Sequence, residues 1–425
     1  MFIIDYKINK CLHDVRDCLT SEFLTYLERY GKNITQNKRD LAKKAVSCLL
    51  LNLYTKHTTK QNTLHITLDK NHYSKSVIVN GKNTGRKVSY TYMRSLLDFL
   101  EFEGYITLEK GKVNSFTFRF GYYEILDSES SKIVIKPKLT NILNNLVTDW
   151  KQEPLSNVIR LRDINKNEIT FKMKGLVREV RDYLYEFNKF SLTKVVSLRD
   201  IVYDVQMYKV YNRSSFNKGA RSFMKDSIQN LSKQDRHDLV IDNIPVCAFD
   251  YKGFEPSLTY SIEQEVMECE DPYELHLDGY DDGLLRKICK TALLIMLNAD
   301  SKEEAFSAIN LNIAKEYNLE KLYLEDKIPS TYIPTKVIMG LLEEKHHLIA
   351  HRFYKSFGLE VQYIGSLIND FVVSYMMQNH EQLVLQVFDE FLCQNTHADK
   401  LEKAMKLAFQ HVFGTDKNCK IVREV

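Results

Sequence analysis

The segment Glu381–Gln394, EQLVLQVFDEFLCQ, places an acidic pair between two apolar runs. LVLQVF is typical of a buried strand and FLCQ of a second strand, so Asp389 and Glu390 are predicted at the turn of a β-hairpin. Two carboxylates between apolar strands are costly unless they coordinate a cation. An exposed hairpin tip, where Asp is common, is the alternative interpretation.

A second candidate acid ends another apolar run. The segment IPVCAFDYKGFEPSLTY, residues 244–260, predicts a strand that ends at Asp250, then a turn and a helical segment. An acid at a strand end is well placed to bind a hard cation through oxygen. Taken by itself, Asp250 is better interpreted as a surface residue of a strand-to-helix turn.

Between these acids lies a predicted helix with two cations on one face. In DGLLRKICKTALLIMLNAD, residues 282–300, Arg286 and Lys290 are four apart and therefore share a face, which Leu294 and Asn298 continue. Two such cations can hold a triphosphate and stabilise leaving pyrophosphate. A solvated basic stripe on an amphipathic helix is the alternative.

The charges are unevenly distributed along the 425 residues. Residues 1–120 carry 20 Lys/Arg and 11 Asp/Glu, a balance of +9, and the remainder carries 39 and 45, a balance of −6, which together give the formal net charge of +3. The basic front part suggests an anionic partner. The acidic back part is compatible with metal-binding carboxylates.

The front part also shows a regular order of elements. Helical spacing over residues 5–56 is followed by strand-like residues 63–80, with a turn at Asn80-Gly81. A helix is then predicted from Ser89 to Gly104.

Two β-rich runs, joined by a turn around Gly111, follow that helix. The order resembles the winged-helix domains of replication and transcription proteins. It implies a basic DNA-binding domain over 1–125, whose helix enters a groove and whose hairpin touches phosphates. A generic α+β segment with a hairpin is the alternative. A further amphipathic helix is predicted near 176–190.

The composition indicates a soluble, intracellular, cytoplasmic protein without membrane partners. The longest apolar runs are too short to span a bilayer, and no signal peptide is visible. The eight cysteines are scattered without a CxxC pair, which favours buried thiols in a reducing compartment.

Together the three segments of the back half resemble the family A DNA polymerases and the related single-subunit phage RNA polymerases. DYKGFEPS is similar to the palm motif DYSxxExR, and VFDE is similar to the palm-hairpin motif VHDE, with Phe388 in place of His. Arg286 and Lys290 match the spacing of the fingers motif. The resemblance covers about half the chain, and the order of the motifs is more specific than any one motif.

Two flanking segments extend the resemblance. GARSFMKDSIQNLSKQDR, residues 219–236, lies where the family has GRxSS…NLQNIP, so Arg221 would reach the duplex minor groove and Gln229 would match the family's glutamine. VQYIGSLINDFVVSYMM, residues 361–377, is similar to the family's MQGxxADI helix, so Gln362 would lie near the primer terminus.

The resemblance implies an α+β fold: a right-hand polymerase palm with small fingers over 201–425, preceded by a linker and thumb-like helices over 126–200. The helical, winged-helix-like domain over 1–125 comes first. No acidic cluster before residue 200 suggests a proofreading exonuclease. A phage or mobile element is a plausible source of such a compact replication protein.

The function implied is template-directed DNA synthesis, in which dNTPs are added to a primer 3′ end with two Mg²⁺ ions, or Mn²⁺ in their place. Asp250 and Asp389 would be catalytic and would hold the metal together with Glu390, while Lys290 would donate a proton. The implied nucleotide-binding residues are Arg286, Lys290, Tyr251, Glu255 and Asn298, and those binding nucleic acid are Arg221, Gln229 and Gln362. Partners would be template and primer DNA and nucleoside triphosphates, and could include replication proteins.

Three alternatives remain at this point. Glu255 and the absence of the fingers tyrosine, replaced by Asn298, favour deoxynucleotides in the resemblance, but an RNA polymerase or primase of the single-subunit type is the runner-up. A non-catalytic DNA-binding replication initiator is the second. Untemplated nucleotide addition in defence is the third.

Overall fold

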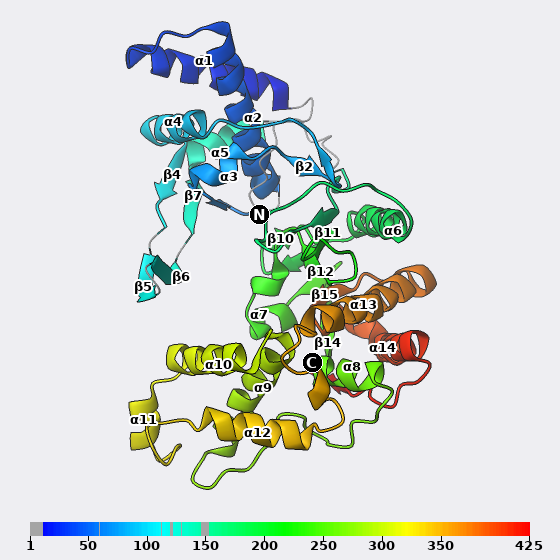
Figure 1. The fold of residues 1–425 in the computed structure, drawn as a ribbon. Coiled ribbons are helices and arrows are strands. Elements are labelled where there is room, and N and C mark those ends of the chain that lie inside the picture. Colours follow the sequence, from blue (N-terminus) through cyan, green and yellow to red (C-terminus); the bar gives the residue numbers. More distant parts are fainter. Residues whose placement is uncertain (1–11, 59, 112, 120–121, 129, 146–152) are drawn as a thin grey trace. The chain divides into compact units, whose positions relative to one another are not determined.

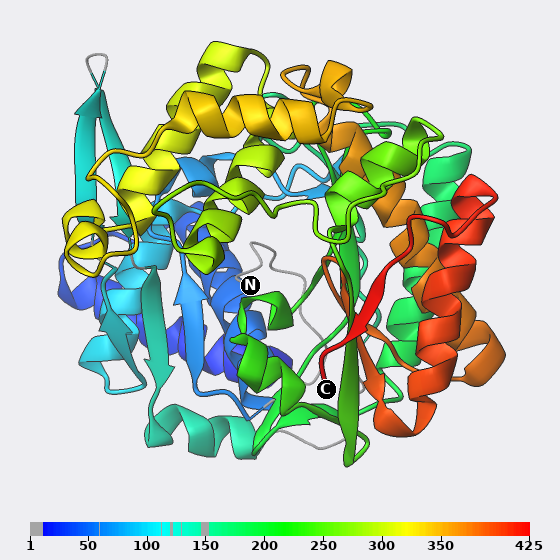
Figure 2. The same cartoon turned by 90° about the horizontal axis from the view of Figure 1, so that it is seen from below.

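The computed structural model describes residues 12–58, 60–111, 113–119, 122–128, 130–145 and 153–425. It contains both helices and strands throughout, which confirms the α+β class (Figures 1 and 2). The chain divides into two compact units. The first unit comprises 1–160, 168–208 and 224–243, and the second unit comprises 161–167, 209–223 and 244–425. The predicted boundaries after residues 125 and 200 stay predictions.

The first unit has a helical core that the sequence predicts. Helices α1 (His13–Arg29), α2 (Gln36–Thr58) and α4 (Tyr90–Phe102) bury their apolar faces in one cluster. The rings of Phe23 and Phe99 join α1 to α4, with centroids 5.6 Å apart. The predicted helical segment within residues 5–56 is therefore confirmed over α1 and α2, and its first residues lie outside the described ones.

A three-stranded antiparallel sheet accompanies these helices. Its order is β1 (Thr63–Ile66), β7 (Ser131–Ile135), β4 (Ile106–Glu109), with β7 paired to both neighbours. Helix α4 precedes β4 directly. Ser89 caps α4 by accepting a hydrogen bond from the Tyr92 amide at 3.4 Å, so the helix predicted from Ser89 is confirmed.

The predicted hairpin around Gly111 is wrong in its pairing. Both runs form strands, but β4 pairs with β7, and β5 (Val113–Arg119) pairs with β6 (Tyr122–Ser128). The β5–β6 hairpin is thus inserted between β4 and β7. Ile133 and Ile135 of β7 are buried, which favours its central position in the sheet. Alternation along a strand shows which face is buried but not which strand is the neighbour.

The predicted turn at Asn80-Gly81 is confirmed. It joins β2 (Ile78–Val79) to β3 (Lys82–Asn83), and the two turn residues have φ values of 44° and 79°. Positive φ at both central residues is what a two-residue hairpin requires, and Asn followed by Gly tolerates it best.

The remaining elements of the first unit are short, apart from α6 (Leu176–Ser191), which confirms the helix predicted near 176–190. Strand β9 (Val196–Leu198) pairs with β10 (Ile201–Tyr203) and with β13 (Val240–Ile241). The other helices are α3 (Lys70–Ser74), α5 (Pro137–Asn144), α7 (Lys233–His237) and the 3-10 helix η2 (Ile228–Asn230). Residues of both units occur in β8 (Ile159–Leu161), β11 (Met207–Tyr211) and β12 (Gly219–Met224).

The second unit is organised around the long strand β14 (Ile244–Tyr251). It pairs antiparallel with β16 (Glu390–Gln394) on one edge and with β17 (Ile421–Arg423) on the other. Strand β15 (Leu385–Val387) extends the sheet beyond β16. The apolar run of β14 is largely buried, as the sequence predicts.

Two groups of helices belong to this sheet. In the first, α13 (Gly358–His380) packs against α14 (Ala398–Phe413) and α8 (Phe254–Ile262) (Figure 1). Gly365 of α13 makes the approach to α8 possible, since a Cβ there would lie 3.0 Å from Leu258. The second group contains α9 (Asp282–Asn298), α10 (Lys302–Glu316) and α12 (Thr335–Lys345), with the short α11 (Leu319–Leu324) and the 3-10 helices η3 (Ala350–Arg352) and η4 (Asn395–His397) completing the unit.

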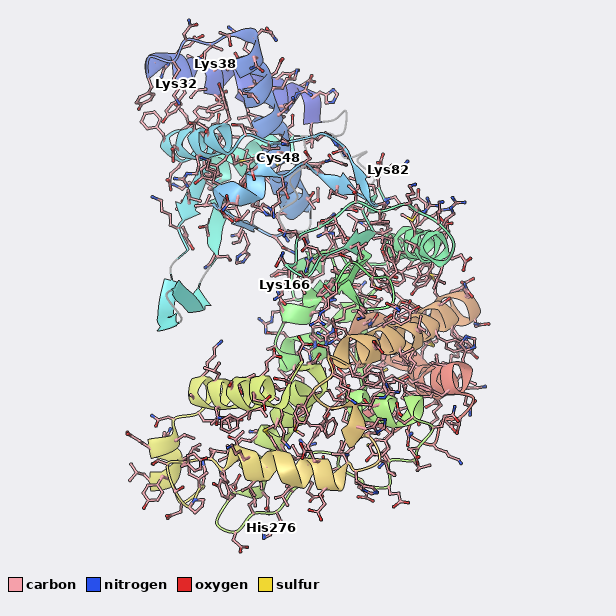
Figure 3. All side chains as sticks on the ribbon, in the orientation of Figure 1. Lys32, Lys38, Cys48, Lys82, Lys166 and His276 are labelled. Carbon is pink, nitrogen blue, oxygen red and sulfur yellow. The ribbon has the colours of Figure 1, made fainter. Side chains whose placement is uncertain are left out.

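No cysteine in the described part of the chain forms a disulfide. Cys48, labelled in Figure 3, is buried in the first unit, and Cys247, Cys289 and Cys393 are buried in the second, whereas Cys18 is exposed. Among the described residues, no helix has both the length and the apolar character that a membrane span requires.

Candidate active site

Strand β14 brings Asp250 beside the hairpin that carries Asp389. In the antiparallel register Asp250 stands opposite Glu390, the first residue of β16. The backbone amide of Tyr251 donates to the Asp389 carbonyl over 3.4 Å. The two predicted catalytic aspartates therefore come together from segments that are far apart in the sequence.

The predicted acidic hairpin is confirmed, but its turn was predicted one residue too late, because Glu390 is already paired in a strand. Val387 of β15 pairs with Glu390 of β16, which leaves Phe388 and Asp389 as a two-residue turn. Phe388 has φ +60°, in the left-handed region that two-residue turns often use but that a residue with a Cβ disfavours. The turn places Asp389 at the end of the sheet.

Burial raises the pKa of both carboxyl groups. For Asp250 the pKa rises to about 7, first because burial removes water and then because Asp389, Glu390 and Glu424 lie nearby. Burial also raises the pKa of Asp389, although backbone hydrogen bonding and Lys290 act in the opposite direction. Oδ1 of Asp250 is buried without a hydrogen-bond partner among the described residues. A bound cation would favour the ionised form of both groups.

Both aspartates line a cleft of about 430 Å³ within the second unit. Its other charged or polar lining residues are Arg221, Tyr251, Lys252, Glu255, Tyr273, Arg286, Lys290 and Glu424. Within the described ranges, no three His, Cys, Asp or Glu side chains are grouped so as to hold a metal ion. A carboxylate pair nevertheless matches Mg²⁺, which commonly takes one or two protein carboxylates and completes its shell with water and substrate phosphates.

Helix α9 presents two cations to this cleft, as its spacing predicts. Nε of Arg286 donates to Oδ2 of Asp271 over 2.7 Å, and its guanidinium lies 5.6 Å from the centre of the Tyr273 ring. The Lys290 ammonium lies 5.7 Å from the same ring. Lys290 also lowers the pKa of Asp250, which indicates that its charge faces the acidic side of the cleft.

A second ion pair, between Arg221 and Glu255, also lines the cleft. Nη2 of Arg221, on β12, lies 3.4 Å from Oε1 of Glu255, near the start of α8. The guanidinium also lies 5.3 Å from the centre of the Phe388 ring. Burial raises the pKa of Glu255, with Arg221 opposing the shift and Asp389 adding to it. Arg221 therefore belongs to the same charged cluster as Asp389.

Gln362 of α13 lines a smaller cavity of about 80 Å³ that shares this cluster. Arg221, Glu255, Phe388 and Asp389 line the same cavity. The structure thus brings Gln362 close to the predicted catalytic hairpin.

The structure places the two other predicted nucleotide-binding residues, Tyr251 and Asn298, differently from each other. Tyr251 lines the cleft but is only 2 % exposed, and its hydroxyl donates to the Met405 carbonyl at 2.8 Å. Asn298 lies outside the lining of the cleft, and its Nδ2 donates to the Leu294 carbonyl of its own helix at 2.7 Å. The stripe on α9 reaches the cleft through Arg286, Lys290 and Leu294 only.

Two more predictions fall outside the cleft. Glu390 is 5 % exposed and does not line the cleft, although its charge raises the pKa of Asp250. Gln229 belongs to the first unit, in η2, and its side-chain amide is buried without a hydrogen-bond partner among the described residues.

Three residues that line or border the cleft, Asp271, Tyr273 and Glu424, were not predicted from the sequence. The first two lie in an irregular loop that Gly253 allows to approach, since a Cβ there would lie 2.7 Å from Pro272. Glu424 follows β17, whose pairing with β14 brings it to the cleft. The only signal available for these residues was their residue type, because neither segment shows a periodic pattern.

No family model matches the chain, and no curated protein matches it. Among solved structures, the chain is similar to one described as the POL domain of Pol1 from M. smegmatis in complex with DNA primer-template and dNTP, with 14% identity and a TM-score of 0.27. The match covers 58% of this chain and 51% of that chain, so this chain spans about half of that relative. A likeness of this level carries no argument about the site, which rests on the geometry above.

Proposed function

We propose that the second unit catalyses template-directed addition of deoxynucleotides to a DNA primer, as a compact polymerase of family A type with palm and small fingers. One observation carries the proposal: Asp250 and Asp389 line one cleft with Arg286 and Lys290, two cations on a single helix face. A carboxylate pair for metal and a cation pair for triphosphate are what nucleotidyl transfer requires.

Asp250 and Asp389 would hold the divalent cations, Mg²⁺ or Mn²⁺. The buried, unpartnered Oδ1 of Asp250 and the raised pKa of both carboxyls support this role. Bound magnesium would supply Lewis-acid stabilisation of the attacking hydroxyl and of the triphosphate. Glu390 and Glu424 add negative charge around Asp250.

The basic side chains of α9 would bind and orient the triphosphate. Nε of Arg286 forms an ion pair with Oδ2 of Asp271 over 2.7 Å, and this ion pair orients the guanidinium group. Lys290 has a compact ammonium group, so it can both neutralise phosphate and hold the proton that leaving pyrophosphate requires. Tyr273 supports both cations with its ring face.

Glu255 would exclude a ribose 2′-hydroxyl and so favour deoxynucleotides. Its carboxyl is held by Arg221 beside Asp389, where the sugar of an incoming nucleotide would lie. An RNA polymerase or primase is the second candidate, because the choice between deoxynucleotides and ribonucleotides rests here on the Glu255 side chain alone.

The first unit would bind duplex DNA. The order of α4, β4, the inserted β5–β6 hairpin and β7 supports a winged-helix reading, with the hairpin as the wing. The excess of Lys and Arg in residues 1–120 supports an anionic partner.

Primer extension by the full chain tests the function. We expect incorporation of dNTPs in Mg²⁺, little incorporation of rNTPs, and none after chelation. Asp389→Asn should abolish extension and leave duplex binding nearly intact, whereas Asp399→Asn, at an exposed site on α14, should extend normally. Full activity of Asp389→Asn would contradict the assignment of the active site. Extension from rNTPs alone on a single-stranded template would favour a primase.

A further inference from the structure

The turn that carries Asp389 is held by two amide side chains. Asn369 on α13 donates from Nδ2 to the Phe388 carbonyl over 2.8 Å, and Gln386 on β15 donates from Nε2 to the same oxygen over 3.3 Å. Both residues are buried, with exposures of 6% and 4%. Donors from two elements thus converge on the one carbonyl that precedes Asp389.

The backbone of this turn needs such support. Phe388 has φ +60°, which is unfavourable for a residue that carries a Cβ. Its ring is 42% exposed, so burial of the side chain does not explain why this conformation persists. The two hydrogen bonds to its carbonyl act directly on the peptide unit that joins Phe388 to Asp389.

The oxygen atoms of the two side-chain amides show that the nitrogen donors are the functional part of each group. Because each nitrogen faces the Phe388 carbonyl, Oδ1 of Asn369 and Oε1 of Gln386 face away, and both are buried without a partner among the described residues. An unpartnered buried acceptor destabilises a fold, and an apolar side chain of similar size would avoid that cost. These amides therefore contribute through the hydrogen bonds that their nitrogens donate to the Phe388 carbonyl.

Both amides also border the acidic cluster. Asn369, Gln386 and Asp389 line the cavity of about 80 Å³, together with Ser222, whose Oγ is likewise buried and unpartnered. A change at either amide would therefore act next to the Asp389 carboxylate.

We propose that Asn369 and Gln386 are positioning residues that fix the Asp389 turn, so that its carboxylate meets Asp250 in the geometry that binds the divalent cation. The inference rests on the proposed function. It assigns the two amides no contact with substrate, and it predicts that their loss weakens cation binding more than nucleotide binding.

The test compares Asn369→Leu with wild type in the full chain. Mn²⁺ binding is measured by EPR without DNA, and extension is measured against Mg²⁺ and dNTP concentration. We expect the half-saturating Mn²⁺ and Mg²⁺ concentrations to rise roughly tenfold. The KM for dNTP at saturating cation should stay within about twofold, and Tm should be nearly unchanged.

A matched control comes from the same helix. Asn379 is exposed, and its Nδ2 donates to the Tyr375 carbonyl at 3.0 Å, so Asn379→Leu removes a similar bond away from the turn and should change nothing. Gln386→Met replaces Asn369→Leu if the latter fails to fold. If wild type is active and both variants match Asn379→Leu in cation response, the positioning role is overturned alone. A wild type that neither extends primers nor binds Mn²⁺ overturns the proposed function and the positioning role together.

Discussion

Arg286 and Asp271 form an ion pair in which Nε, and not the end of the guanidinium, meets Oδ2 over 2.7 Å. The pKa of Asp271 is below its usual value, because the backbone amide of Tyr273 and Arg286 outweigh the effect of burial, which raises it. The carboxylate is therefore ionised at neutral pH, and it fixes the direction of an arginine that lines the cleft. The loop carrying Asp271 is itself held by Lys345, whose Nζ donates to the Asp271 carbonyl at 2.9 Å.

This pair predicts that Asp271→Ala acts on nucleotide binding. Without its partner, Arg286 loses orientation but keeps its charge, so we expect the KM for dNTP to rise by roughly 3–10-fold with a smaller change in kcat. Arg286→Ala should be more severe. Asp278→Ala, a fully exposed acid in the neighbouring loop, serves as the control in the same steady-state assay. Equal KM values for the Asp271 and Asp278 variants would contradict the orienting role.

Asp250→Asn is predicted to stabilise the protein when no divalent cation is present. The folded-state pKa of about 7 lies above the ordinary value of 3.8, so ionised Asp250 destabilises the fold. This penalty is absent when the pH is below the ordinary pKa, grows as the pH rises between the two pKa values, and is complete when the pH is above the folded-state pKa. Asn removes it, and we expect a gain on the order of 1–3 kcal/mol at about pH 8.

Thermal unfolding in EDTA checks this gain. The difference in Tm between Asp250→Asn and wild type should be positive near pH 8 and should vanish near pH 4. A lower Tm for the variant at the higher pH would show that Asp250 is stabilised in the fold by contacts that its raised pKa does not reflect.

Cation binding should weaken as pH falls through about 7, because protonated Asp250 must release its proton before it can ligate. The half-saturating Mg²⁺ concentration for extension is therefore expected to rise by roughly tenfold per pH unit below that value. Mg²⁺ should correspondingly raise Tm at about pH 8 and have little effect near pH 5. A cation requirement that stays constant with pH would place the metal elsewhere.

Glu255→Ala is predicted to admit ribonucleotides. The change removes the carboxyl that Arg221 holds at 3.4 Å beside the predicted sugar position, so rNTP incorporation relative to dNTP should rise by roughly tenfold or more. The measurement is the ratio of kcat/KM for the two nucleotides on one template. Glu263→Ala is a control on the same side of the sheet: Glu263 follows α8 and forms an ion pair with Arg352 away from the cleft. An unchanged ratio would favour an enzyme whose sugar choice is made by another residue.

Thr91→Glu is predicted to weaken duplex binding by the full chain. Thr91 is exposed in the first turn of α4, where an acid suits the helix but repels phosphate. We expect a loss of roughly tenfold in affinity at about 0.1 M salt, measured by fluorescence anisotropy, with no loss of Tm. Thr25→Glu, exposed on α1, provides the matched change. If both variants bind alike, α4 does not face the duplex.

The amino-acid sequence alone located several of the longer helices and several strands of this protein. Apolar spacing located α1, α2, α4, α6 and α9, and the Asn80-Gly81 pair located a tight turn, because these signals are local in the chain. Apolar runs on either side of Asp389 also located the acidic hairpin. The hairpin predicted around Gly111 is wrong because β4 pairs with β7, which is distant in the sequence. The periodicity of a strand does not indicate which strand it pairs with.

Only the tertiary structure decided which acids and cations meet. Antiparallel pairing of β14 with β16 and β17 brought Asp250, Asp389 and Glu424 to one cleft, while the same pairing kept Glu390 out of its lining. Packing also ties the Tyr251 hydroxyl to the Met405 carbonyl and pairs Asp271, which no sequence pattern marked, with Arg286. The physical reason is that periodicity reports how one segment is buried, whereas a site depends on side chains from separate segments, whose distances are set by pairing and packing.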